Sequence, residues 1–247
     1  TTRYTNHKTS NKPTAYTDPF GRVTNYTYDP VHGGLLTATR PAPGAGQYST
    51  QNPKSTIFTA DNGTGIYMPQ TATTCAVATT CATSQKAQEI QTAWTYTAPH
   101  RQVQSLTVQS GDGALSSTVA TQYYAQGDVW TVDGPLPGTS DTSYSYYDVL
   151  RRPVAAVAPD PDGSGPLTHP VTRTAYNADG NVTQVDAGRV STPTNWNNLT
   201  LTSRVKSYYD AHGRKIKDEV IQVGGAQNGQ IGAMTQYSYD GLGRIEC

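Results

Sequence analysis

The chain has 247 residues, of which 35% are hydrophobic and 15% charged, and its formal net charge is zero. This length allows one all-β domain or two smaller ones, each with a sizeable core. The neutral balance argues against nucleic acid as the main partner, because phosphate binding needs a cationic surface. No run of about 18 apolar residues occurs, so we expect no membrane-spanning segment. The 17 tyrosines and 3 tryptophans oppose disorder and favour a sheet whose buried face is tyrosine, valine and threonine.

Residues 1–43 carry strand and turn signals. The segment 22–28 alternates in character and places Tyr26 and Tyr28 on one face of a strand. Two glycines then lead into a second strand at 35–39, which prolines end. We therefore assign 1–43 to β-hairpins.

Residues 44–92 lose this pattern and read as an insertion rich in Thr, Gly and Pro, long enough to hide one or two degenerate repeats. Cys75 and Cys81 lie six positions apart in it, without the Cys-x-x-Cys spacing or the nearby histidine of a zinc site. A local disulfide is favoured, since an exported chain would oxidise; two free cysteines are the alternative. Cys247 has no evident partner. Residues 84–92 have a helix-forming composition but are too few for a stable helix.

Residues 93–247 return to hairpins, so the whole chain is expected to be one continuous array interrupted by the insertion. Short apolar and aromatic segments are separated by Gly, Pro and Asp clusters, which mark turns. The expected strands cover residues 92–97, 102–109, 117–124, 129–132, 142–147, 153–158, 171–176, 182–186, 203–209, 215–223 and 235–239.

The organising motif is clearest at residues 208–216, where tyrosines precede an Asp-x-x-Gly-Arg turn. The carboxylate of Asp210 can accept a hydrogen bond from the turn backbone, and Gly213 can take a positive φ without a steric penalty. Tyrosine before the turn and an apolar residue after it are typical of a β-hairpin.

The motif recurs with the acid position at residues 18, 29, 97, 124, 148, 177, 210 and 240. From 97 onward the gaps, by subtraction, are 27, 24, 29, 33 and 30 residues, which is the period of a repeat array. The turn residues assigned in this way are Asp18, Gly21, Arg22, Asp29, Asp148, Asn177, Gly180, Asp210, Gly213, Arg214, Asp240, Gly243 and Arg244.

These Tyr-Asp-x-x-Gly-Arg copies, with Tyr-x-Tyr-Asp at 26–29 and 237–240, resemble the YD repeats of the RHS (rearrangement hot spot) family. That family includes bacterial polymorphic toxins, shell components of insecticidal toxin complexes, and teneurins. The resemblance covers most of the chain outside 44–92. It implies hairpins joined edge to edge into a strip that spirals into a hollow shell able to enclose a C-terminal toxic domain; surface adhesion is the family's other theme.

Two departures limit what the resemblance implies. The family's shell is several times longer, so 247 residues could form only an arc of it, and we expect this chain to be a piece of a longer polypeptide. The Asp-Pro-rich autoproteolytic motif and a toxin domain are both absent. The resemblance therefore implies architecture and no catalytic residues.

For the other candidate sites, a structural interpretation is stronger than a functional one. Asp160 and Asp162 match the first positions of a calcium loop, but Val171 stands where a bidentate Glu is needed. The five histidines show no metal-ligand spacing, and no nucleophile elbow or phosphate-binding glycine loop occurs. We expect no enzyme activity, no cofactor and no metal.

The repeat residues are interpreted as structural. We expect Asp210 and Asp240 to cap their turns, and the arginines to lie along the next hairpin, over a neighbouring tyrosine ring or beside a neighbouring aspartate. The expected arginines are Arg22, Arg214 and Arg244. The functional alternative is that exposed tyrosines and tryptophans bind surface glycans; the tryptophans concerned are Trp94, Trp130 and Trp196.

We therefore predict an all-β fold of tandem antiparallel hairpins in one curved, spiralling sheet, an arc of an RHS-type shell. The expected role is non-enzymatic: a wall segment of a secreted or surface-exposed bacterial protein, with flanking repeats as partners through its edge strands and a toxin domain as cargo. The alternative is a self-associating subunit of an extracellular filament or adhesin, whose edges pair with identical copies.

Overall fold

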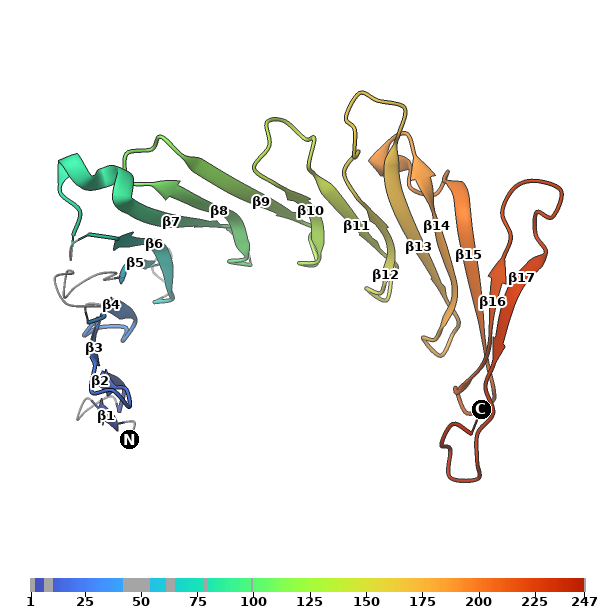
Figure 1. The fold of residues 1–247 in the computed structure, drawn as a ribbon, viewed down its shortest axis with the longest axis horizontal. Coiled ribbons are helices and arrows are strands. Elements are labelled where there is room, and N and C mark those ends of the chain that lie inside the picture. The colour runs from blue at the N-terminus through green and yellow to red at the C-terminus, as the bar shows by residue number, and fades with distance from the viewer. Residues whose placement is uncertain are drawn as a thin grey trace. The chain divides into compact units, whose positions relative to one another are not determined.

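The computed structural model describes residues 3–6, 11–41, 54–60, 65–77, 80–98 and 100–246. The chain divides into two compact units, Thr1–Ala120 and Thr121–Cys247. In each unit the strands lie side by side in chain order and run antiparallel (Figure 1). The predicted all-β hairpin fold is thus confirmed.

Nine strands begin among the described residues of the first unit, and each of the first eight pairs with the next in sequence. They are β1 (Arg3–Asn6), β2 (Pro13–Thr17), β3 (Val23–Tyr28), β4 (Leu35–Thr39), β5 (Lys54–Ala60), β6 (Tyr67–Cys75), β7 (Glu89–Tyr96), β8 (Val103–Ser110) and β9 (Ser116–Tyr123), with the 3₁₀ helix η1 (Thr83–Gln88) between β6 and β7.

The described residues of the second unit form eight strands in the same antiparallel meander. They are β10 (Val129–Asp133), β11 (Ser143–Tyr147), β12 (Pro153–Val157), β13 (His169–Tyr176), β14 (Val182–Val190), β15 (Thr200–Tyr209), β16 (Lys215–Ile221) and β17 (Ile231–Gln236), with the 3₁₀ helix η2 (Pro193–Asn195) before β15.

The expected insertion at 44–92 contains a hairpin of the array. Strands β5 and β6 pair in register from Lys54↔Thr74 to Ala60↔Tyr67, and β6 pairs with β7. One degenerate repeat is therefore hidden there, and its turn at 61–64 lies outside the described residues. The helix-forming composition at 84–92 gives only η1, after which the chain enters β7.

Consecutive turns of a meander lie alternately at the two ends of its strands. Among the described residues, the tight turns that start at 29, 97, 124, 148, 177, 210 and 240 follow odd-numbered strands. The tight turn at 18 follows β2, and most other connections after even-numbered strands are longer. In the second unit, Figure 1 shows the loops after β10, β12 and β16 at the strand ends opposite the tight turns. The repeating unit is therefore a pair of strands with one tight turn and one loop.

The core of the second unit is small. Val157 and Val171 are register partners, and together with Val190 they are buried. Two tyrosines of β11, Tyr144 and Tyr146, pack against them. Trp196 and Leu199, from the connection between β14 and β15, do the same. In the described part of the chain, no helix is long and apolar enough to cross a membrane.

Candidate functional site: the tyrosine-aspartate turns

The turn between β15 and β16 shows how the motif works. The Asp210 backbone N–H donates to Arg214 O at 2.9 Å, and Gly213 N–H donates to Asp210 O at 3.0 Å. One carboxylate oxygen of Asp210, Oδ1, accepts from the backbone N–H groups of His212 and Arg214, each at 2.9 Å. The other, Oδ2, accepts from Arg214 Nε at 2.7 Å. Gly213 has φ +75°, so this is a three-residue hairpin loop that ends in a left-handed glycine.

The same bonds recur in the turns of Asp18, Asp148 and Asp240, where the carboxylate accepts from the backbone and the side chain of the arginine four residues later. Asn177 keeps the backbone bond, accepting from Asn181 N–H at 2.8 Å, and has no arginine partner in this turn. Gly21, Gly180 and Gly243 all have positive φ. The turn chemistry is thus local and repeats with the sequence.

Backbone hydrogen bonds fix the electrostatics of these carboxylates. Hydrogen bonding from the Arg214 backbone, followed by its guanidinium, lowers the pKa of Asp210. Hydrogen bonds from the Arg244 backbone and side chain lower the pKa of Asp240 in the same way. Both carboxylates are therefore committed to structural hydrogen bonds in their ionised form.

Two turns are one residue longer. Asp29 N–H donates to Gly34 O, and Gly33, at φ +68°, takes the left-handed position. In the turn that starts at Thr97, Arg101 takes that position at φ +53°. In the three-residue turn of Asp148, Arg151 replaces the glycine and adopts φ +63°.

The residue immediately before a turn is here called the leading residue, and at five turns it ties its hairpin to the one before it. The Tyr209 hydroxyl donates to Val182 O at 2.8 Å, and Tyr239 donates to Lys215 O at 2.7 Å. In each case the acceptor is the residue that pairs with the preceding leading residue across its own hairpin. The same relation holds for Tyr28 with Pro13, Tyr96 with Pro69, and Tyr176 with Pro153.

A β-bulge accompanies the leading residue. Tyr208 pairs with Lys217 but Tyr209 pairs with Lys215, so Ile216 is the extra residue of the return strand. The register shifts at the equivalent place before the turns at 29, 97, 148 and 177. Because a bulge re-aims side chains, it offers a reason why the leading tyrosine reaches the neighbouring hairpin.

Arginines reinforce this coupling, two of them towards the following hairpin and one towards the preceding hairpin. The Arg214 guanidinium lies 4.8 Å from the ring centre of Tyr239, and that of Arg152 lies 4.5 Å from Tyr176. Arg151 reaches back to Asp128 with two hydrogen bonds of 2.9 and 2.7 Å. Each turn of this group is thus linked both to its predecessor and to its successor.

Two of the expected arginines behave differently. Arg22 does not lie along the next hairpin: it pairs with Asp18 and lies 5.5 Å from Phe20 of its own turn. The reason is topological: this turn follows β2 and the turn at 29 follows β3, so the two turns lie at opposite ends of the strands. Arg244 pairs with Asp240, and no described ring lies over it.

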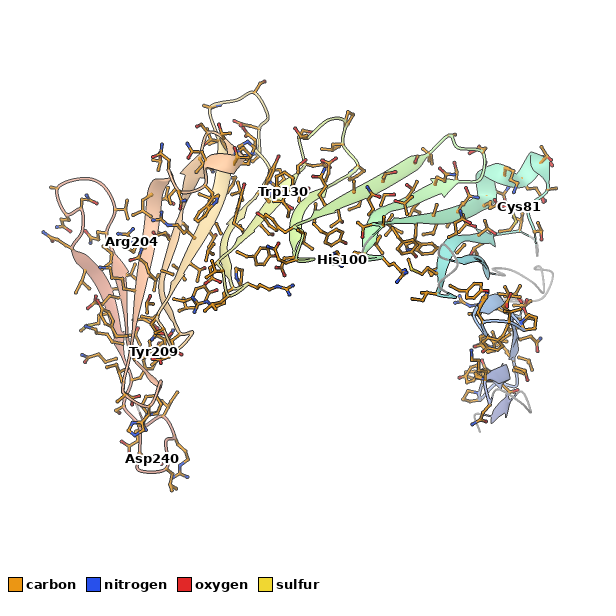
Figure 2. The ribbon with its side chains drawn as sticks, turned by 180° about the vertical axis from the view of Figure 1, so that it is seen from behind. Cys81, His100, Trp130, Arg204, Tyr209 and Asp240 are labelled. Atoms are coloured by element: carbon orange, nitrogen blue, oxygen red, sulfur yellow. A yellow bond between two sulfur atoms is a disulfide. The ribbon has the colours of Figure 1, made fainter. Side chains whose placement is uncertain are left out.

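Figure 2 shows Arg204 among the strands, and Tyr209 and Asp240 towards the tight turns. Arg204 belongs to a charged row that the sequence analysis did not identify. Asp186 is completely buried and register-paired with Arg173 and Arg204, whose guanidinium groups donate to it at 2.6 Å. Burial alone would raise the pKa of Asp186, but hydrogen bonds from Arg204 and Arg173 outweigh it and lower the pKa.

The aromatic side chains proposed as glycan platforms are half-buried. The ring centres of Trp196 and Tyr146 lie 5.3 Å apart, and those of Trp130 and Tyr124 lie 6.1 Å apart. Burial, and then the neighbouring tyrosines, raise the pKa of Tyr146 to about 12, and its hydroxyl donates to Pro193 O. An open hollow of about 550 Å³ beside Trp196 is lined by Asp186, Arg173 and Gln184, which bond to one another.

The remaining candidates are placed as follows. Cys75 and Cys81 form a disulfide beside η1, at the edge of the first unit opposite His100 (Figure 2); Cys247 lies outside the described residues. Asp160 accepts a hydrogen bond from the backbone of Asp162 within the loop after β12. No group of three or more His, Cys, Asp or Glu side chains that could hold a metal occurs among the described residues.

No protein-family model and no curated protein matches the sequence. Solved structures do match its fold. A crystal structure of TcdB2-TccC3-Cdc42 is 14% identical with a TM-score of 0.53, and TcdB2-TccC3 without its hypervariable C-terminal region gives the same two values. A mutant Tc holotoxin pore of Photorhabdus luminescens is 13% identical with a TM-score of 0.50. Each match covers 99% of this chain but only 13% of the other, so this chain spans the length of a small part of the matched chains and the likeness shows the fold alone.

Proposed function

We propose that this chain is a non-enzymatic wall segment of an RHS-type β-shell, in a secreted or surface-exposed bacterial protein. The observation that carries the proposal is the bond from five leading tyrosines to the preceding hairpin; they are Tyr28, Tyr96, Tyr176, Tyr209 and Tyr239. A device that couples each hairpin to the next is what a continuous wall requires.

The polar residues support the same conclusion, because the aspartates of the turns are engaged in structural bonds. Asp210 and Asp240 each bind two backbone N–H groups and an arginine. Asp186 is likewise saturated by Arg173, Gln184 and Arg204. A reactive carboxylate would need a free oxygen directed at a substrate.

The likeness to Tc toxin chains gives the wall its context. One of those structures is named as a Tc holotoxin pore, and this chain covers 13% of the length of each of the matched chains. In the proposed assembly the partners are flanking repeats, and a toxin domain is the enclosed cargo.

A self-associating filament subunit is the second candidate. Strand β17 favours it, because β17 pairs only with β16 among the described residues, and all six of its residues are exposed. Such an unpaired edge is a template for another strand.

Electron microscopy and sedimentation of the purified chain over a range of concentrations separate the two. Monomers or short closed particles are expected for the wall segment. Long regular fibres that grow with concentration would replace it with the filament.

A further inference from the structure

The last turn of the array, Asp240–Arg244, carries the two groups that receive a leading tyrosine in the preceding turns. We infer that Arg244 and the backbone carbonyl of Ile245 form a socket for the tyrosine of another YD-type hairpin, and that this hairpin is not the N-terminal one of a second copy. The inference rests on the proposed function and specifies the partner of its open edge.

The carbonyl half of the socket follows from the register. Tyr209 pairs with Lys215, and the Lys215 carbonyl accepts from the next leading residue, Tyr239. Tyr239 in turn pairs with Ile245 across the last turn. Ile245 O is therefore the next acceptor of the series, and no donor among the described residues is bonded to it.

The guanidinium half follows from exposure. Arg152 and Arg214 both pair with the aspartate of their own turn and lie over the next leading tyrosine, and their side chains are 28% and 37% exposed. Arg244 makes the same pair with Asp240, but its side chain is 75% exposed. The conformation that accepts a ring is thus already formed, because Asp240 holds Nε at 2.6 Å.

The adjoining strand supplies the rest of the surface. Ile231 and Met234 on β17 are each 52% exposed, and Ile245 is 65% exposed. In a continued array the return strand that starts at Ile245 would pair with the open edge of β17, as β16 pairs with β15, and the next hairpin would pair with that return strand, as β17 pairs with β16.

The N-terminal hairpin of a second copy lacks the matching side chain. Asn6 pairs with Pro13 after a register shift, as Tyr28 pairs with Leu35, so Asn6 occupies the leading position of the β1–β2 hairpin. End-to-end stacking of identical chains would place asparagine at the socket. Asparagine has no ring for Arg244 to stack on, so the socket selects a tyrosine-bearing hairpin.

The test extends the intact chain by one repeat. Because 245–247 align with 215–217, a copy of residues 218–246 appended after Cys247 continues the array in register. Hydrogen exchange of the β17 amides is compared between the native and extended chains. Two variants of the extended chain are compared. One is Arg244→Ala, and the other has phenylalanine in place of the tyrosine copied from Tyr239. Arg22→Ala is the matched control, because Arg22 pairs with the aspartate of its own turn but lies over no leading tyrosine.

We expect protection of β17 to rise at least tenfold on extension, and each socket variant to reduce it about 3- to 10-fold, the effect of one hydrogen bond or stacked cation. The control should leave it unchanged. A rise that is insensitive to both variants overturns the socket but leaves the wall proposal standing. Absence of any rise overturns both.

A second measurement addresses the choice of partner. Sedimentation of the native chain should show no end-to-end association that depends on Arg244. Association abolished by Arg244→Ala would overturn the exclusion of identical copies.

Discussion

The hydroxyl of Tyr209 donates a 2.8 Å hydrogen bond to the main-chain carbonyl oxygen of Val182, 27 residues earlier. The bond adds a side-chain contact to the β14–β15 backbone pairing that joins the two hairpins, and equivalent bonds recur along the array. Because the acceptor is a backbone atom, the neighbouring hairpin can vary in sequence without losing it. This explains why the motif is conserved within the chain at the turn and not along the strands.

Removal of this hydroxyl should weaken the second unit. Tyr209→Phe keeps the ring but leaves Val182 O without its donor, so we expect a loss of about 0.5–1.5 kcal/mol in the free energy of unfolding. Urea unfolding followed by tryptophan fluorescence measures it. Tyr144→Phe is the control, since no described residue hydrogen-bonds to that hydroxyl, and equal losses in the two variants would contradict the coupling role.

The planar guanidinium of Arg214 should matter more than its charge. Arg214→Lys retains the charge but loses the fixed geometry that binds Asp210 and stacks on Tyr239. The expected loss exceeds that of Arg244→Lys by about 0.5–1 kcal/mol, the contribution of an exposed cation–π contact. Equal urea midpoints for the two variants would show that the stacking contributes nothing.

The sequence predicted what is local and missed what depends on register. The turns of Asp210 and Asp240 could be assigned because all their bonds lie within five residues. The hidden repeat could not be located, because Phe58 is recognisable as its leading residue only through its pairing with Pro69, whose carbonyl accepts from Tyr96.

The same limit explains two further outcomes. Asp186 meets Arg173 and Arg204 only because three strands align them, and their sequence separations of 13 and 18 carry no signal. Asp18 has the same turn hydrogen bonds, but its turn lies at the opposite ends of the strands from the turn at 29. The motif alone could not show this, because it does not encode which strand of the meander precedes the turn.

Asp186 should be the most sensitive carboxylate in the second unit. Asp186→Asn leaves two guanidinium groups facing a neutral side chain, and we expect a loss of about 2–4 kcal/mol, below the full value for a buried pair because both arginines are partly exposed. Asp128→Asn removes an exposed pair with Arg151 and should cost at most about 1 kcal/mol. Thermal unfolding that ranks the two variants equally would contradict this assignment.

Acid should weaken the turns. Because the folded pKa of Asp210 lies below its unfolded value of about 3.9, its contribution is complete above that pH and is lost as the pH falls through the folded pKa. We therefore expect Asp210→Asn to destabilise the chain at pH 7 and the difference from wild type to shrink as the pH falls below about 3.9. Urea midpoints across this pH range measure the difference. Asp179→Asn, in the exposed tip of the neighbouring turn, is the control. A difference that does not depend on pH would show that the turn does not require the ionised form of Asp210.

Arg151 sets backbone strain against an ion pair. Its φ of +63° is a conformation that costs a non-glycine residue about 1–2 kcal/mol, whereas its exposed bonds to Asp128 should contribute about 0.2–1 kcal/mol. We expect Arg151→Gly to be more stable than wild type by about 0.5 kcal/mol, and Arg151→Ala, which keeps the strain and loses the pair, to be the least stable of the three. Urea unfolding of the three proteins gives the order directly. If Arg151→Ala matched or exceeded Arg151→Gly in stability, the left-handed backbone at this turn would carry no measurable strain.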